Sequence, residues 1–256
     1  MSYGAAPPAG DRIDIIAAVQ TAYSTVWRNV NLAVELAWLP FALVVVAEIV
    51  ALVLGAGGMF GMLLADLVRD LGLAVFGTIF IVRWHRFVLL GETASGGLFP
   101  PGWVPFFIAT IKIVLLVILG AVIVVLIAAL PPHFLTGLIA TVAGFALVVG
   151  AARLSLVFPA AAIERPIALR TAWYLAAGNF WRLFACLALC TLPFALLNYL
   201  LGESGDASAA IVWLVFRIID LAVSFAGAAV VASLLSDLYR QLVSEPGQAP
   251  PRQIGG

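Results

Sequence analysis

Charged residues are scarce in this chain, and their scarcity is the first clue to its class. Only 10% of the 256 residues are Asp, Glu, Lys or Arg, whereas 64% are hydrophobic and the mean hydropathy is +1.16. A soluble domain is about 45–50% apolar, so an aqueous fold could not bury this excess. The 13 basic and 13 acidic residues cancel, which argues against a general affinity for nucleic acid. The composition therefore predicts an integral membrane protein.

Cysteine and histidine are nearly absent, which argues against disulfide and metal chemistry. Cys186 and Cys190 lie four residues apart in an apolar run, and this spacing fits neither a disulfide framework nor a zinc motif. The two histidines, His85 and His133, are expected on opposite sides of the membrane. Ser155 has no histidine near it in the sequence, so no nucleophile with its base is evident. We expect no catalytic, cofactor-binding or metal-binding residues, and no enzyme activity.

Long apolar runs fill most of the chain, and a bilayer crossing needs about 20 such residues. Because every backbone polar group must be paired inside hydrocarbon, the crossings are expected to be helices. We predict an all-α integral membrane bundle of six transmembrane helices within residues 11–243, with tails at 1–10 and 244–256 disordered because they are rich in Gly, Pro and Ser. The spans are expected at about 32–54, 60–82, 105–130, 134–158, 180–201 and 210–236, paired through short turns at 55–59, 131–133 and 202–208.

Basic residues cluster on one side of this predicted layout. The three short turns contain no Lys or Arg, whereas the N-terminal segment, the long connectors 83–104 and 159–179 with their flanks, and the C-terminal segment carry most of them. Cytoplasmic segments hold the excess of positive charge. We therefore expect a multi-pass protein of the cell inner membrane, with both termini cytoplasmic and the short turns outside. Its expected partners are membrane lipids, chiefly anionic headgroups at the cytoplasmic face.

The stretch "RWHR" places basic and aromatic residues at the end of the second predicted span. Such residues are typical of the membrane interface, where Trp lies at headgroup level and Arg reaches the phosphates. An anion or phosphate site is the competing interpretation. The candidate interface anchors are Trp27, Arg28, Arg83, Trp84, His85, Arg86, Trp181 and Arg182.

Two segments before spans have helical amphipathic spacing, 12–29 and 165–182. Each is expected to lie in the inner headgroup region, although each could instead extend the following span. They also introduce an internal repeat, because "TAYSTVWRN…LPFAL" at 21–43 parallels "TAWYLAAGNFWRL…LPFAL" at 171–196. Pro40 and Pro193 would then kink the first and fifth spans at similar depth.

The segment "RLSLVFPAAAIERPIALRTAWYLAAGNFWRLF", residues 153–184, resembles a pattern in bacterial multi-helix membrane proteins. These include the membrane domain associated with glycerophosphodiester phosphodiesterases and related stand-alone proteins of unknown function. Arg153, Pro159, Glu164, Gly178 and Arg182 carry the likeness, whereas a serine is more usual at Thr171. We expect no phosphodiesterase domain here, because no segment of soluble-domain length remains. The resemblance brings no catalytic residues with it.

Six charged residues fall inside predicted spans and form the candidate intramembrane charge cluster: Glu48, Asp66, Arg69, Asp70, Arg217 and Asp220. A charge at the bilayer centre costs about 2.5–3.5 kcal/mol on insertion scales, so the six are expected to pair or to line water. All are predicted at similar depth in the outer leaflet, given a rise of ~1.5 Å per residue. The cluster either locks the helices together or lines a pathway for protons, ions or a polar substrate.

The two interpretations lead to two functions. The first is a non-catalytic membrane protein that organises lipids or binds protein partners. The second is a small transporter or channel that uses the charge cluster. A water-accessible cavity reaching Arg69 would favour transport, and a solid bundle would favour the organising role.

Overall fold

The computed structural model describes residues 12–93, 97–130, 134–205 and 210–243, and this described part is helical without a strand. The predicted all-α class is therefore confirmed. The predicted tails, and the turn 131–133, lie outside the described residues. The elements are α1 (Ile15–Arg28), α2 (Val30–Gly55), α3 (Gly58–Gly72), the π-helix η1 (Leu73–Gly77), α4 (Thr78–Leu90), α5 (Trp103–Ala128), α6 (Phe134–Leu154), α7 (Val157–Ala162), α8 (Leu169–Leu175), α9 (Phe180–Gly205) and α10 (Ala210–Val243).

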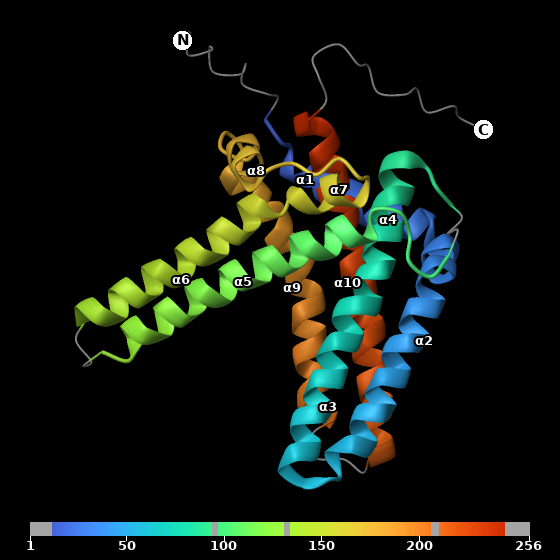
Figure 1. The fold of residues 1–256 in the computed structure, drawn as a ribbon. Helices are drawn as coiled ribbons and strands as arrows, with labels where there is room; N and C mark the ends of the chain where they lie inside the picture. The colour runs from blue at the N-terminus through green and yellow to red at the C-terminus, as the bar shows by residue number, and fades with distance from the viewer. Residues whose placement is uncertain (1–11, 94–96, 131–133, 206–209, 244–256) are drawn as a thin grey trace.

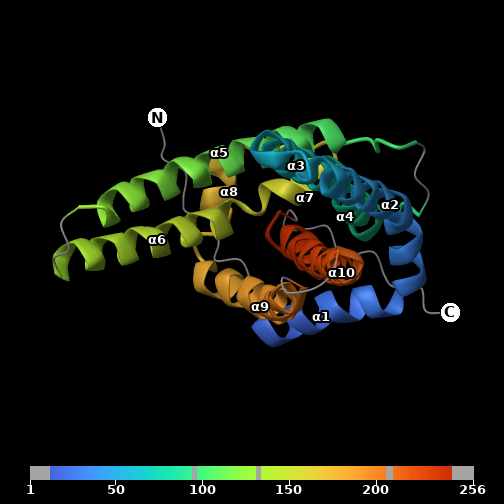
Figure 2. The same cartoon turned by 90° about the horizontal axis from the view of Figure 1, so that it is seen from below.

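Helices α2, α3 with α4, α9 and α10 run side by side, and α10 lies among the others (Figures 1 and 2). The start of α1, α7, α8 and the end of α10 share one end of this bundle, here called the terminal end (Figure 1). The opposite end, here called the turn end, holds the α2–α3 turn. The α5–α6 hairpin leaves the bundle near the terminal end and leans away from it (Figure 1). The hairpin therefore shares little surface with the other long helices.

Five helical segments are long and apolar enough to cross a membrane: Val30–Gly55, Trp103–Ala128, Phe134–Ala162, Phe180–Gly202 and Ile211–Val243. They correspond to the first, third, fourth, fifth and sixth predicted spans, with ends that differ by a few residues. The second predicted span, 60–82, is not among them. A multi-pass membrane protein is thus supported by five candidate spans among the described residues, and the predicted count of six is not confirmed.

The second predicted span is interrupted by a π-helical turn, which divides residues 58–90 into α3, η1 and α4. Neither helix alone reaches the length of a crossing, but the three elements follow one another along one side of α2 (Figure 1). Gly61 permits close packing at the α2–α3 turn, because a Cβ there would lie 2.2 Å from the carbonyl oxygen of Leu54.

Both predicted amphipathic segments contain a short helix before a long one. In the first, α1 is separated from α2 by Asn29, and in the second, α8 is separated from α9 by the turn at 176–179. Ala22 and Ala172, equivalent in the predicted repeat, are both fully buried. The environments of the two prolines differ, since Pro40 is buried and Pro193 is exposed. The repeated sequence therefore gives similar local structure in different surroundings.

Candidate functional site

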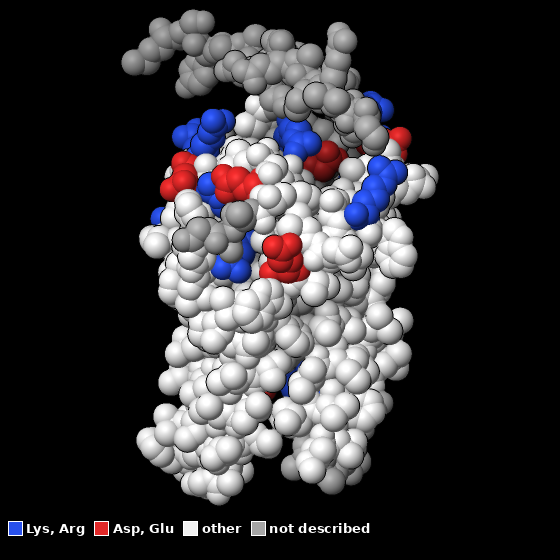
Figure 3. Space-filling model, turned by 90° about the vertical axis from the view of Figure 1, so that its right-hand side faces the viewer, with Lys and Arg blue, Asp and Glu red and all other residues white. Residues whose placement is uncertain are grey.

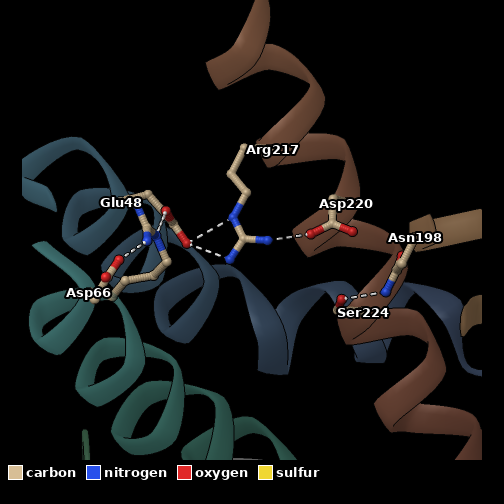
Figure 4. A network of polar contacts seen from close by, with 7 residues as sticks. Glu48, Asp66, Asn198, Arg217, Asp220 and Ser224 are labelled. Atoms are coloured by element: carbon tan, nitrogen blue, oxygen red, sulfur yellow. Dashed lines mark hydrogen bonds and ion pairs between the residues drawn. The ribbon is translucent and has the colours of Figure 1, made fainter. Parts of the chain in front are cut away.

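The predicted charge cluster forms around one buried carboxylate, Glu48 of α2, whose exposed fraction is 1%. Its Oε2 accepts a hydrogen bond from Arg69 Nε of α3 at 3.0 Å. Its Oε1 accepts from Arg217 of α10, from Nε at 3.0 Å and from Nη2 at 2.9 Å. Figure 4 shows Glu48 with its contacts to Arg217. One acid thus joins three helices, which compensates the desolvation of its charge.

Two further carboxylates complete the network. Asp66 Oδ1 accepts from Arg69 Nη1 at 2.7 Å, and Asp220 Oδ2 accepts from Arg217 Nη1 at 2.6 Å. Each pair spans one helical turn within its own helix. The Asp66 side chain is 67% exposed and that of Asp220 only 14%. Asp70 is exposed and forms no ion pair with the residues that the structure describes. The structure therefore brings five of the six predicted residues together and leaves Asp70 outside.

A cavity of about 400 Å³ opens beside this network. Its lining includes Arg69, Arg217 and Asp220 of the network together with Asn198 and Trp213. Asn198 Nδ2 donates to Ser224 Oγ at 2.9 Å, so α9 contributes a polar group to the same wall (Figure 4). In the face shown in Figure 3, the lower half is white apart from a few charged atoms deep in a narrow cleft. The cavity therefore leaves space for water or a polar group beside the two arginines.

An aromatic layer lies between this cavity and the terminal end. Phe225 of α10 contacts Phe80 of α4, with ring centroids 5.2 Å apart, and Phe41 of α2 at 5.3 Å. Leu221, one helical turn from Arg217, is buried in the same cluster. The three rings come from α2, from α4 and from α10, whereas the charge network comes from α2, from α3 and from α10. Since α3 continues through η1 into α4, the rings lie along the same helices as the network, a few turns nearer the terminal end. The packed rings therefore separate the charge network from the terminal end along α2, α4 and α10.

The expected interface position of Arg83, Trp84, His85 and Arg86 is wrong, because all four side chains are buried inside the protein. The helix does not end at residue 83 but continues to Leu90, and α10 covers it. Trp84 Nε1 donates to Ser233 Oγ at 2.8 Å, and His85 Nδ1 hydrogen-bonds Ser236 Oγ at 2.7 Å. The basic stretch therefore holds helices together instead of meeting lipid.

The two arginines of this stretch use different partners. Arg86 forms a bidentate pair with Glu92 at 2.7 and 2.8 Å, donates to the Ala162 carbonyl, and lies 3.5 Å from Glu164. The hydrogen bonds to Glu92 raise the pKa of Arg86. Among the described residues, Arg83 donates to the carbonyl oxygens of Leu36, Gly97 and Leu98, and burial lowers its pKa.

His85 is the third titratable group in this stretch. Burial lowers its pKa from 6.5 to about 3, so the imidazole is neutral at physiological pH. Its Nε2 has no hydrogen-bond partner among the described residues, and Phe106 packs beside the ring. A neutral, buried ring held by one serine has the features of a packing residue. We find no group of three His, Cys, Asp or Glu side chains in the described ranges that could hold a metal ion.

The other predicted anchors lie at the surface of the terminal end. Trp27, Arg28 and Trp181 are exposed, and Arg182 is partly buried. Their positions are compatible with an interface, in contrast to those in α4. Sequence patterns gave no sign of Arg12 and Arg153 as neighbours of Arg182, although all three line one cavity. Their wide separation along the chain left no local signal to find.

Comparisons with family models, with curated proteins and with solved structures give no match to this chain. The resemblance to the membrane domain associated with glycerophosphodiester phosphodiesterases therefore stays a prediction. The functional proposals below depend on the geometry of the chain alone.

Proposed function

We propose that the chain is a cell inner-membrane protein that crosses the bilayer six times. Residues at about 60–82, within the continuous helical stretch 58–90, would supply the sixth crossing, because about 23 helical residues reach about 35 Å at 1.5 Å per residue. The terminal end would face the cytoplasm, with both chain termini, since most arginines outside the charge cluster lie there. Helices α1 and α8 would lie in the headgroup layer, where exposed arginines attract anionic lipids.

Within that membrane we propose a non-catalytic role in organising lipids or binding a protein partner. The observation that carries this proposal is the α5–α6 hairpin. In the most apolar 18 residues of these helices only 6% and 0% are buried, against 50% in α10. An apolar surface of this extent faces either lipid chains or another protein. The hairpin offers that surface at a distance from the bundle (Figures 1 and 2).

Site-specific photo-crosslinking in native membranes tests this role. A photo-reactive amino acid replaces Leu119 of α5, and a second variant carries it at Leu196 of α9 as a control of matched exposure, 61% against 60%. We expect a discrete protein adduct or an enriched lipid class at position 119 and bulk lipid at 196. Identical adduct patterns at both positions would contradict a specialised role for the hairpin. Mass spectrometry of the adducts identifies what was captured.

Transport is the second candidate function, and the cavity beside Arg69 favours it. Two features place it second. The network already pairs both arginines with carboxylates, and the Phe41–Phe80–Phe225 layer is packed between the network and the terminal end. Passage would require that layer to open. The π-helix η1 lies between Arg69 of α3 and Phe80 of α4. An opening of the aromatic layer would start there, since π-helical turns often occur at functional sites.

Asparagine substitutions separate the two functions. In proteoliposomes with a pH- or cation-sensitive dye, a transporter with Asp220→Asn should lose flux while its unfolding temperature stays near that of the parent. If the cluster only locks helices, Asp220→Asn should lower the unfolding temperature and no variant should differ in flux. Asp70→Asn serves as the control, because Asp70 lies outside the network.

A further inference from the structure

Three arginines from distant parts of the chain converge at the terminal end. Arg12 precedes α1, Arg153 ends α6, and Arg182 is in the first turn of α9. All three line a cavity of about 380 Å³, which falls in the range of about 300–1,000 Å³ usual for ligand pockets. The ion pairs among the described residues involve only Arg69, Arg86 and Arg217 as cations. The converging guanidinium groups therefore lack a carboxylate partner in that part of the chain.

Among the described residues, the carboxylate of Asp14 could offset this charge, because Asp14 lines an adjoining hollow with Arg12 and Arg182. Its Oδ1 accepts the backbone N–H of Ala17 at 3.1 Å and so caps the start of α1. Among the described residues that line the two hollows, one carboxylate faces three guanidinium groups, so positive charge is in excess there. The first residues of α9 also line the cavity, and the positive end of that helix dipole adds to the field.

The arginines are held in place without using most of their donors. The guanidinium of Arg153 lies 4.5 Å from the ring centroid of Trp173 and 4.7 Å from that of Phe180. Its Nε is buried and has no hydrogen-bond partner among the residues described. Arg182 donates from Nη1 to the Ile13 carbonyl at 2.6 Å. Since a guanidinium has five N–H donors, several remain for a ligand.

A contact between segments far apart in the sequence fixes the backbone beside these arginines. Asn179 is buried, and its Oδ1 accepts the backbone N–H of Ile13 at 3.1 Å. Together with the bond from Arg182, this ties the start of α1 to the start of α9. A ligand would therefore meet a formed site, which lowers the entropy lost on binding.

We propose that this cavity binds a phosphate group. Planar guanidinium forks match phosphate oxygens in bidentate geometry, and several in one cavity favour a multiply accepting anion. The favoured source is the headgroup of an anionic phospholipid, because Trp173 and Trp181 are exposed beside the site and Trp prefers the membrane interface. This site deepens the proposed function and rests on the proposed place of the terminal end in the headgroup layer, because it names one cavity in which an anionic headgroup would be held.

Binding to the full purified chain tests the proposal. The protein in nanodiscs of phosphatidylcholine is titrated with phosphatidylglycerol, and separately with inorganic phosphate, while intrinsic tryptophan fluorescence and lipid retention by native mass spectrometry are recorded. The double variant Arg153→Gln/Arg182→Gln removes two forks, and Arg170→Gln removes an exposed arginine of α8 as the control. We expect binding about tenfold weaker or more in the double variant and unchanged in the control.

The two titrations, with phosphatidylglycerol and with inorganic phosphate, distinguish a lipid headgroup from a soluble phosphate ligand. Saturation by phosphatidylglycerol that inorganic phosphate displaces only at high concentration supports a lipid headgroup, and equal action of inorganic phosphate alone supports a soluble ligand. Equal affinities of the parent and the double variant for both probes would overturn the proposal. If the double variant does not fold, Arg153→Lys/Arg182→Lys keeps the charge but loses the forks. Unchanged binding in that variant would likewise overturn it. Crosslinking at Leu119 is unaffected by any of these outcomes, so the two proposals fail separately.

Discussion

The Tyr23 hydroxyl donates a hydrogen bond, at 3.4 Å, to the backbone carbonyl of Leu189. Leu189 lies four residues before Pro193, which has no N–H to complete the helical bond to that carbonyl. The equivalent carbonyl of the other repeat copy, Leu36 before Pro40, accepts from Arg83 Nη1 at 3.3 Å. Each proline of the "LPFAL" repeat therefore leaves a free acceptor, and a side chain from another helix occupies it.

A double-mutant cycle tests this relationship at the second copy. Tyr23→Phe should lower the free energy of unfolding by about 0.5–1 kcal/mol in the parent, because one neutral hydrogen bond is lost. In a Pro193→Ala background, the introduced alanine supplies its own N–H to the Leu189 carbonyl, so Tyr23→Phe should have almost no effect. Chemical unfolding in detergent, followed by circular dichroism, measures all four proteins. Equal effects of Tyr23→Phe in both backgrounds would show that the proline and the tyrosine are independent.

Glu48→Gln should be the most damaging single change in the charge network. It leaves two guanidinium groups facing a neutral amide, and breaking a buried pair costs about 3–5 kcal/mol. We expect the lower end of that range, since the arginine side chains are 27% and 28% exposed. Glu35→Gln makes the same chemical change at an exposed position of α2 and should be nearly neutral. The unfolding temperature in detergent is the measurement, and equal values for the two variants would refute a central role for Glu48.

Much of this fold follows from hydropathy, because apolar length and helical pairing of the backbone decide which segments span. The cluster around Glu48 was predictable for the same reason, since charges in apolar helices at equal depth must find one another. The burial of residues 83–86 inside the protein was not predictable in this way. Burial of this stretch depends on α10 covering α4 through Ser233 and Ser236, which lie 149 and 151 positions from their partners. Local composition contains no information about such a contact.

The sequence patterns also did not predict where a regular helix is interrupted. The π-turn η1 lies in an apolar run without Pro, and the Thr78 hydroxyl that follows it donates to the Ala74 and Val75 carbonyls inside the turn, but a single threonine after an apolar run does not by itself predict a π-turn. The lean of the α5–α6 hairpin likewise has no local signature, because apolar helices look alike whether they face protein or lipid. Convergence of Arg12, Arg153 and Arg182 depends on how three ends of helices meet. These features arise from tertiary packing.

His85 gives the chain a specific dependence of stability on pH. Because burial lowers its pKa to about 3 from an ordinary 6.5, the folded state holds the neutral ring while the unfolded state gains a proton. The stability it contributes is complete above pH 6.5 and is lost as the pH falls from 6.5 toward 3. Between about pH 7.5 and about pH 5 the loss should reach about 2 kcal/mol. In His85→Gln, which does not titrate, the unfolding free energy should vary less over this window. Parallel pH profiles for the two proteins would contradict the assignment.

Gly102 should tolerate no side chain. Its φ is +80°, and a Cβ would lie 2.1 Å from the carbonyl oxygen of Ala162 at the end of α7. Gly102→Ala therefore combines left-handed strain with a backbone clash and should destabilise the protein by at least about 2 kcal/mol. Gly97→Ala in the same connector is the control, because nothing lies within 4 Å of its Cβ. Chemical unfolding compares the two, and a Gly102→Ala protein as stable as Gly97→Ala would argue against the close approach of α7.

Labelling in intact cells tests the proposed orientation. In a background with Cys186→Ala and Cys190→Ala, which removes two buried thiols, Met59→Cys reports on the α2–α3 turn and Arg170→Cys on α8. Both positions are exposed, so accessibility to a membrane-impermeant maleimide depends on the side of the membrane. We expect Met59→Cys to react in intact cells and Arg170→Cys only after permeabilisation, because arginine-rich segments stay cytoplasmic. Reaction of Arg170→Cys from outside would invert the topology, and with it the leaflet assigned to the phosphate site.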